Sequence, residues 1–262
     1  MHCLKYPAEQ TEPPQPPGVT LPTMYDLPSE NPEEPGLPDE FHDLQPQLLS
    51  ATFRLKDYVA DQIFTASDLN LYYDVRHQLW YKRPDWFGVV GVPRLYQGKD
   101  MRLSYVMWQE GVSPFVVVEL LSPGTEDEDL GRASKQMPVM LDKPPSKWQV
   151  YEQVLRVPYY VVFDRYTDQL QVFHLLSGHY EAMTLSDNRL WIPELNIGLG
   201  VWQGTYQGIE RLWLRWFDDS NEWIATGDEQ VVAAAAALEQ ERRRSERLAQ
   251  RLRDLGVDPD EI

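Results

Sequence analysis

Short apolar runs, separated by polar and turn-forming residues, fill the middle of the chain. Three of them show little polar–apolar alternation and are rich in β-branched or aromatic residues: residues 86–92, 115–118 and 159–163. Such runs are typical of strands buried on both faces of a sheet. Residues 169–175 and 179–184 flank Ser177 and Gly178, a pattern that predicts a β-hairpin. We therefore expect a sheet at the centre of the fold.

A helical period replaces the strand pattern at residues 147–154. Trp148, Tyr151 and Leu155 form an apolar stripe there, and Ser146 is the predicted N-cap. We expect a short helix that packs this stripe against the sheet.

A second helical segment, rich in Ala, Glu and Arg, spans residues 231–255, and Gly256 is expected to end it. It carries a short apolar seam at heptad-like spacing, made of Leu248, Leu252 and Leu255. Six arginines between positions 242 and 253 make this the most basic part of the chain. Three interpretations stay open: a solvated helix, a homodimer helix, or a face that contacts phosphates.

Residues 1–46 differ from the rest, because they hold eleven of the 21 prolines and nine acids against the single base Lys5. Such a segment buries too little apolar surface to offset its ordering entropy. We expect an extended arm without helix or strand that protease removes without unfolding the rest. It is either a solvated leader or an arm that packs on its own domain or a partner through Tyr25, Leu27 and Phe41.

The composition and the motifs of the chain argue against several classes of function. The net charge is −17, which argues against tight non-specific binding of nucleic acid, although the arm accounts for about half of it. With Cys3 as the one cysteine, neither an intramolecular disulfide nor a cysteine zinc site can form. No apolar run approaches the length of a membrane span, so we expect a cytoplasmic protein. The five histidines lack metal-ligand spacing, and nucleophile-elbow, phosphate-loop and dinucleotide motifs are absent.

Two carboxylates occupy apolar surroundings. Glu119 interrupts the apolar run at residues 115–121, and Asp85 stands at the head of another run. An ionised glutamate buried in a strand costs several kcal/mol unless a cation or hydrogen bonds compensate. A divalent metal is one candidate partner, and two acids on neighbouring strands are expected to point at one ion.

The acids belong to an ordered set of motifs: Pro84-Asp85, Glu119-Leu120-Leu121-Ser122-Pro123, Lys147-Trp148-Gln149-Val150-Tyr151, and the strand at residues 159–164 that ends in Asp164. This set resembles the PD-(D/E)XK nuclease superfamily, and within it the Uma-two-type family of "putative restriction endonucleases". The resemblance covers about residues 50–215.

The resemblance implies an α/β fold of the restriction-endonuclease type, with a mixed central sheet flanked by helices, a strand-rich extension and a protruding C-terminal helix. The domains expected are an arm at 1–46, a nuclease domain at 47–225 and a helix at 226–262. The implied activity is metal-dependent cleavage of DNA. Asp85 and Glu119 would bind Mg²⁺ or Mn²⁺, with the Leu120 carbonyl as a candidate third ligand.

One position departs from the superfamily pattern. The lysine of the (D/E)-x-K motif falls on Leu121, an apolar residue. The resemblance suggests that Lys147 on the following helix replaces it, orienting water or stabilising charge. Lys135 and Lys143 lie in a proline-broken loop and fit the motif less well. We predict that the Lys147 amine lies within about 4 Å of Glu119, the reach of an ion pair.

Two other functions stay open. The missing lysine and the acidity favour a non-catalytic module that keeps the fold and binds nucleic acid or protein. The third is a scaffold that dimerises through the C-terminal helix and offers its acidic arm to partners.

Overall fold

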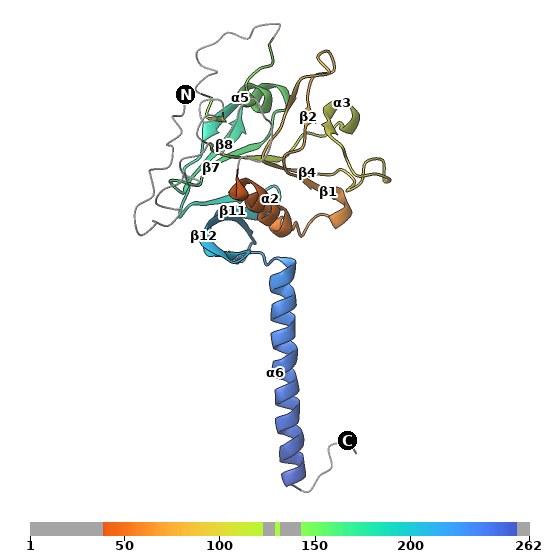
Figure 1. The fold of residues 1–262 in the computed structure, drawn as a ribbon, viewed down its shortest axis with the longest axis vertical. Helices are drawn as coiled ribbons and strands as arrows, with labels where there is room; N and C mark the ends of the chain where they lie inside the picture. Colours follow the sequence, from red (N-terminus) through yellow and green to blue (C-terminus); the bar gives the residue numbers. More distant parts are fainter. Residues whose placement is uncertain (1–38, 123–128, 132–142, 256–262) are drawn as a thin grey trace, which may run out of the picture.

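A computed structural model describes residues 39–122, 129–131 and 143–255, and its centre is a mixed sheet of six strands (Figure 1). The strands in spatial order are β1 (Ile63–Ala66), β4 (Trp86–Val90), β6 (Val116–Leu120), β7 (Tyr159–Asp164), β8 (Gln169–Leu176) and β9 (His179–Ala182). Within this sheet β6 and β7 pair in parallel and the other neighbours are antiparallel. The β8–β9 hairpin was predicted and is confirmed.

Two smaller sheets and several helices complete the described part of the fold. The three-stranded sheets are β3 (Tyr81–Lys82), β2 (Leu71–Tyr72) and β5 (Tyr105–Val106), and β10 (Arg189–Ile192), β11 (Ile197–Tyr206) and β12 (Ile209–Phe217). The helical elements are α2 (Glu40–Thr52), η1 (Ala60–Gln62), α3 (Met107–Glu110), α5 (Lys147–Gln149), η2 (Val150–Val154) and α6 (Gly227–Asp254). The predicted α/β class, with a mixed central sheet and a strand-rich extension, is confirmed.

The two faces of the central sheet support separate cores, because side chains alternate along a strand. One core contains the even-numbered positions of β6 together with α2 and the β10–β12 sheet: Val116, Val118, Leu120, Leu48, Leu49, Trp213 and Trp216. The other contains Val117 and Leu121 together with α5–η2 and the small β3–β2–β5 sheet: Val150, Tyr151, Leu71 and Tyr105. Because Glu119 on β6 is two residues from Val117 and from Leu121, its side chain lies on the same face of the sheet as theirs.

Helix α2 corrects the prediction for the N-terminal arm. That prediction excluded regular structure up to residue 46, but α2 begins at Glu40 and has Pro46 inside it. Asp39 caps the helix by accepting a hydrogen bond from the His42 amide, and Phe41 is 4% exposed in the core. The prediction failed because proline and acid content outweighed this cap and the apolar face behind it. The rest of the arm, residues 1–38, lies outside the described residues.

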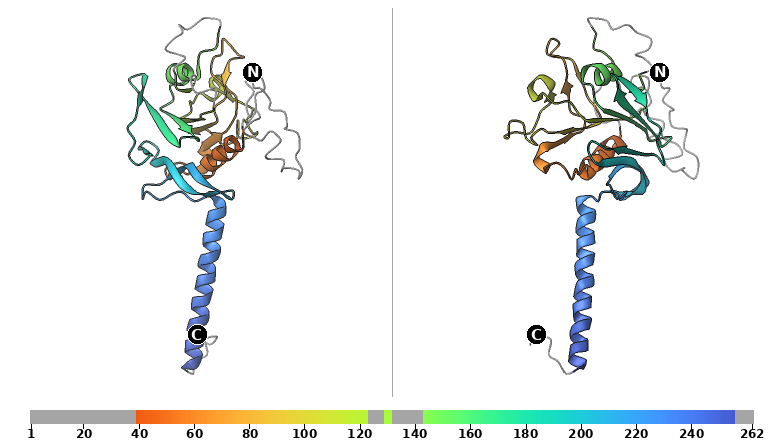
Figure 2. Two further views of the ribbon diagram at one scale, coloured as in Figure 1. Left: turned by 60° about the vertical axis from the view of Figure 1, so that its left-hand side comes forward. Right: turned by 180° about the vertical axis from the view of Figure 1, so that it is seen from behind.

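The C-terminal helix α6 leaves the body of the molecule and stands apart from it in every view (Figures 1 and 2). Thr226 and Glu229 form a capping box at its start, and the Arg215 guanidinium binds Glu229 through an ion pair. None of its residues in the range 227–254 is buried. The predicted protruding helix is therefore confirmed. Across the described residues, no helix combines the length and apolarity that crossing a membrane requires.

Candidate active site

Glu119 is the centre of a buried polar cluster. Its side chain is fully buried, and β6 directs it toward the face covered by α5 and η2. The Tyr151 hydroxyl donates to Glu119 Oε1 at 2.7 Å, and the Lys147 amine lies 3.1 Å from Oε2. These bonds supply the compensation that a carboxylate buried in an apolar strand requires.

Asp85 is tied to the same strand from the adjacent one. It immediately precedes β4, which pairs with β6 so that Trp86 faces Val118. The Asp85 Oδ2 atom accepts a hydrogen bond from the Leu120 amide at 2.6 Å, and the Asp85 amide donates to Glu119 Oε2 at 3.4 Å. The structure thus brings the two predicted acids together in one cluster.

Lys147 enters this cluster from the start of α5. Ser146 caps the helix, as predicted, and forms a capping box with Gln149. The Lys147 amine pairs with Glu119 Oε2 at 3.1 Å and with Asp129 Oδ1 at 2.9 Å. Its distance from Glu119 lies within the predicted 4 Å. Of the two rival lysines, Lys143 is exposed to solvent and Lys135 lies outside the described residues.

Asp129 is a member that the sequence did not reveal. It ends a charge run at residues 126–129 that would ordinarily face water, yet its side chain is 1% exposed. The Tyr160 hydroxyl, from β7, donates to the Asp129 carbonyl at 2.8 Å and holds this segment over the sheet. Asp129 thus departs from the solvated state that is typical of such a charge run. Residues 126–128 lie outside the described residues.

His42 of α2 is the second residue that sequence reasoning missed. Its Nδ1 lies 2.9 Å from Asp39 Oδ1, and its Nε2 lies 3.2 Å from the Leu120 carbonyl oxygen. Both oxygens are acceptors, so satisfying both contacts requires a proton on each ring nitrogen. Burial alone lowers the His42 pKa, but the hydrogen bond to Asp39 and the charge of Asp85 outweigh it and raise that pKa. His42 thus directs a ring nitrogen at the Leu120 carbonyl, the candidate third metal ligand.

Burial sets the protonation of the acids. It raises the pKa of Asp85 and raises the pKa of Glu119 well above the usual range, although the Lys147 charge opposes both shifts. For Lys147 itself, burial lowers the pKa, but the charges of Glu119, Asp129 and Asp85 prevail and hold it well above its ordinary value. Lys147 is therefore an ammonium at neutral pH.

The donor set suits a hard divalent cation. Carboxylate oxygens are the ligands that Mg²⁺ prefers, and Mg²⁺ needs only one or two of them because it keeps several waters. A carboxylate has about four acceptor sites, more than the three contacts described for Glu119 or the one described for Asp85. Within the described residues, no cluster of three or more His, Cys, Asp or Glu ligands exists, so any such ion would depend on this pair and on water.

A mixed sheet with the buried Glu119, the half-buried Asp85 and Lys147 gathered on one face defines an α/β protein of the restriction-endonuclease type. The family model described as "Uma2: Putative restriction endonuclease" matches residues 20–206, and the chain belongs to this family. The matched range contains every member of the cluster and ends before α6.

Among solved structures, the chain is similar to one described as "a putative nuclease belonging to DUF820 from Anabaena variabilis ATCC 29413". The two are 12% identical with a TM-score of 0.40, over 61% of this chain and 76% of that chain. No curated protein matches the chain significantly.

Proposed function

We propose that this protein is a metal-dependent endonuclease that hydrolyses DNA phosphodiester bonds with Mg²⁺ or Mn²⁺. The observation that carries the proposal is the position of the Lys147 amine, 3.1 Å from Glu119 in a cluster that also contains Asp85. Lys147 would therefore supply, beside the two acids, the basic group that Leu121 cannot supply.

Asp85 and Glu119 are the residues that would hold the ion, through their carboxylate oxygens. A bound divalent ion polarises a phosphoryl oxygen and lowers the pKa of an attacking water. The raised pKa values of both acids fit this role, because a nearby cation offsets the cost of ionising them in a buried place.

Lys147 acts through its charge and not as a base. Its raised pKa keeps the amine protonated, so it would donate hydrogen bonds to water or to a phosphoryl oxygen on which negative charge develops. Tyr151 holds Glu119 in place by donating a hydrogen bond to it, and Asp129 holds Lys147 in place by pairing with its amine.

The test is cleavage of plasmid and linear DNA with Mg²⁺, Mn²⁺ or EDTA, comparing wild type with Glu119→Gln. We expect cleavage that needs the metal and that falls about 10² to 10³-fold in the variant, a loss of the size found when one group that stabilises the transition state is removed. Glu152→Gln is the matched control, because Glu152 is also buried but accepts from the Tyr180 amide outside the cluster.

Calorimetry with Mn²⁺ on the same three proteins separates the candidate functions. The proposal expects metal binding by wild type and Glu152→Gln and weak or no binding by Glu119→Gln. DNA binding without cleavage under any metal would instead support the non-catalytic module, which the acidity of the chain and Leu121 favour.

A further inference from the structure

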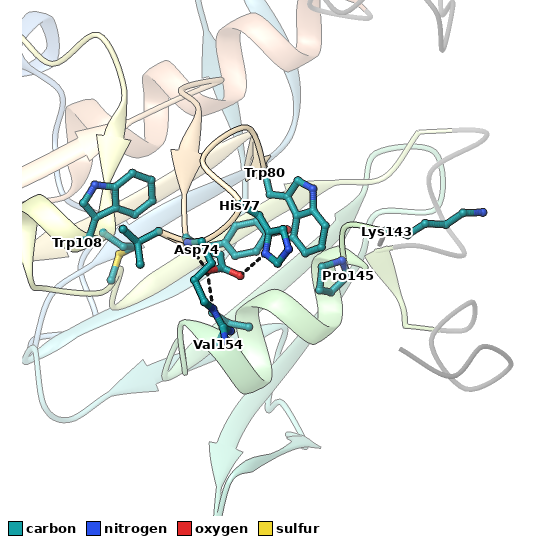
Figure 3. Close-up of a pocket in the computed structure, with 11 residues that line it drawn as sticks. Asp74, His77, Trp80, Trp108, Lys143, Pro145 and Val154 are labelled. Atoms are coloured by element: carbon teal, nitrogen blue, oxygen red, sulfur yellow. Dashed lines mark hydrogen bonds and ion pairs between the residues drawn. The ribbon is translucent and has the colours of Figure 1, made fainter. Parts of the chain in front are cut away.

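A cavity of about 540 Å³ lies beside the α5–η2 helical segment (Figure 3), and its lining includes none of the residues of the acid cluster. It is lined by the turn after β2, by α3 and by both ends of the helical segment, where Pro145 and Val154 contribute. Its volume falls in the range of small-ligand sites, about 300–1,000 Å³. None of the roles assigned above uses it.

Aromatic rings give this cavity flat surfaces. The Trp80 and His77 rings stack at 3.8 Å with an interplanar angle of 8°, so one face of the indole is covered by the imidazole. Trp108 of α3 leaves 38% of its surface exposed, and Figure 3 draws the two indoles on opposite sides of Asp74. Val75 and Val154 add apolar surface that is 53% and 47% exposed. An apolar, ring-lined cavity of this kind suits a planar ligand.

Polar groups in the cavity suit a ligand that carries both amino groups and negative charge. Asp74 accepts from His77 Nδ1 at 2.8 Å and from the Arg76 amide at 2.9 Å. The His77 hydrogen bond is the largest of the effects that lower the Asp74 pKa, so this carboxylate is ionised and available as an acceptor. The Arg76 side chain, which is 84% exposed, adds a cation to the lining, with its Nε 3.5 Å from Asp74 Oδ1.

One short helical segment contributes residues both to the cavity and to the acid cluster. Pro145 and Val154 face the cavity, whereas Lys147 and Tyr151, between them in sequence, contact Glu119. The ring-lined cavity and the acids therefore share one helical segment, and this shared segment is the observation that relates the cavity to a DNA strand bound at the acids.

We propose that this cavity, lined by His77, Trp80 and Trp108, binds an unpaired nucleobase of the nucleic-acid substrate. The proposal rests on the proposed function for the identity of the substrate. Stacking suits it because every base presents a π face, so the site would accept bases with little sequence preference. It implies that the protein engages DNA at overhangs, flaps or opened duplex in preference to continuous duplex.

The test measures binding by wild-type full-length protein, in EDTA, of a duplex whose single-stranded overhang carries 2-aminopurine. Working without metal keeps the result independent of cleavage. We expect quenching of the 2-aminopurine and about tenfold weaker binding by Trp108→Ala, within the range for one stacked base. Trp191→Ala is the matched control, because Trp191 is also 38% exposed but lies on β10, and it should bind as wild type does.

An abasic site at the same overhang position completes a double-mutant cycle. If the base occupies the cavity, the abasic site weakens binding to wild type but not to Trp108→Ala, and Trp108→Phe restores part of the loss. Equal effects of the abasic site on both proteins, or no quenching in wild type, would overturn the proposal. If the protein binds the base but never cleaves DNA, the proposed endonuclease function is refuted and the nucleobase site stands. If it cleaves DNA with metal but does not bind the base, the nucleobase site is refuted and the endonuclease function stands.

Discussion

The Lys147 amine lies 3.1 Å from Glu119 Oε2, although the two residues are 28 positions apart and belong to different elements. Glu119 comes from the middle of the sheet and Lys147 from the first turn of the helical segment that covers it. Because Asp129 lies on the other side of the amine at 2.9 Å, the ammonium is fixed by two carboxylates. Because its side chain is already ordered, a lysine held in this way can present a positive charge to a substrate without losing further conformational entropy.

Lys147→Ala should strongly reduce DNA cleavage while leaving metal binding measurable. The variant keeps Asp85 and Glu119 but loses the charge that stabilises the transition state, so we expect a loss of about 10² to 10³-fold. Single-turnover cleavage and Mn²⁺ calorimetry are the two measurements. Lys56→Ala serves as the control, because Lys56 is a 55% exposed lysine that pairs with Asp219 away from the cluster. Full activity of Lys147→Ala would assign the charge to another group.

Tyr151→Phe tests whether Glu119 needs its hydroxyl partner. The change removes a 2.7 Å hydrogen bond to a buried carboxylate and little else. Hydrogen bonds to charged groups contribute about 1.5–3 kcal/mol, so unfolding in urea should show a loss of that size. Cleavage should fall less than in Lys147→Ala, because Tyr151 positions Glu119 and contacts no reacting group in the proposal. An unchanged free energy of unfolding would mean that Glu119 is protonated or otherwise satisfied.

The pH dependence of the free energy of unfolding should show the cost of ionising Asp85 and Glu119 in the absence of a metal ion. A carboxyl whose pKa is raised by folding contributes stability that is present below its unfolded pKa, about pH 4, and is lost as pH rises through its folded pKa. Burial raises the pKa of both Asp85 and Glu119, so in EDTA the free energy of unfolding should fall from pH 5 to pH 8 more in wild type than in Glu119→Gln. The raised Lys147 pKa acts in the alkaline range, because its contribution is lost only as pH rises above the ordinary lysine value.

Adding Mg²⁺ at pH 8 completes this experiment. An ion that binds only the folded state at 100 times its Kd adds about 2.7 kcal/mol to the free energy of unfolding. Wild type should gain such stability and Glu119→Gln should not. Parallel pH profiles for the two proteins, or equal stabilisation by Mg²⁺, would contradict the assignment of the acids.

Much of the site was predictable because local rules govern it. The strand around Glu119 is apolar enough that its burial follows from the sequence, and a buried acid demands partners. Ser146 signals the start of the helix, and the spacing from Lys147 to Tyr151 places both on one helical face. The contacts of both residues with Glu119 agree with this reasoning.

The two missed residues depend on contacts between distant parts of the chain. His42 reaches the Leu120 carbonyl across 78 positions, and Asp129 is held down through the Tyr160 hydroxyl, 31 positions away. An acid within a charge run and a histidine within an acidic, proline-rich stretch are ordinarily solvated. These two residues differ only because α2 packs on one face of the sheet and the Asp129 segment is held on the other face by Tyr160 of β7. No local pattern encodes that packing.

The exposed helix α6 leads to a prediction about assembly. Isolated helices are marginal in water, and most helices gain their stability from packing an apolar face. Yet in α6 every apolar position is accessible, including Val231, Leu238 and Leu248 at 69%, 73% and 51% exposure. Two sets of apolar residues in α6 repeat at multiples of seven positions. The first set is Val231, Leu238 and Leu252, and the second, offset by three positions within the heptad, is Leu248 and Leu255. This is the spacing of a coiled-coil seam.

We therefore predict that the full-length chain forms a homodimer through α6, measurable by sedimentation equilibrium at micromolar concentration. Leu248→Glu places a charge in the seam and should shift the protein to monomer, because like charges would meet across the two-fold axis. Gln250→Glu adds the same charge on the same helix but off the seam, and it should leave the dimer intact. A monomeric wild type, or equal dissociation by the two variants, would show that α6 is a solvated helix or serves another partner.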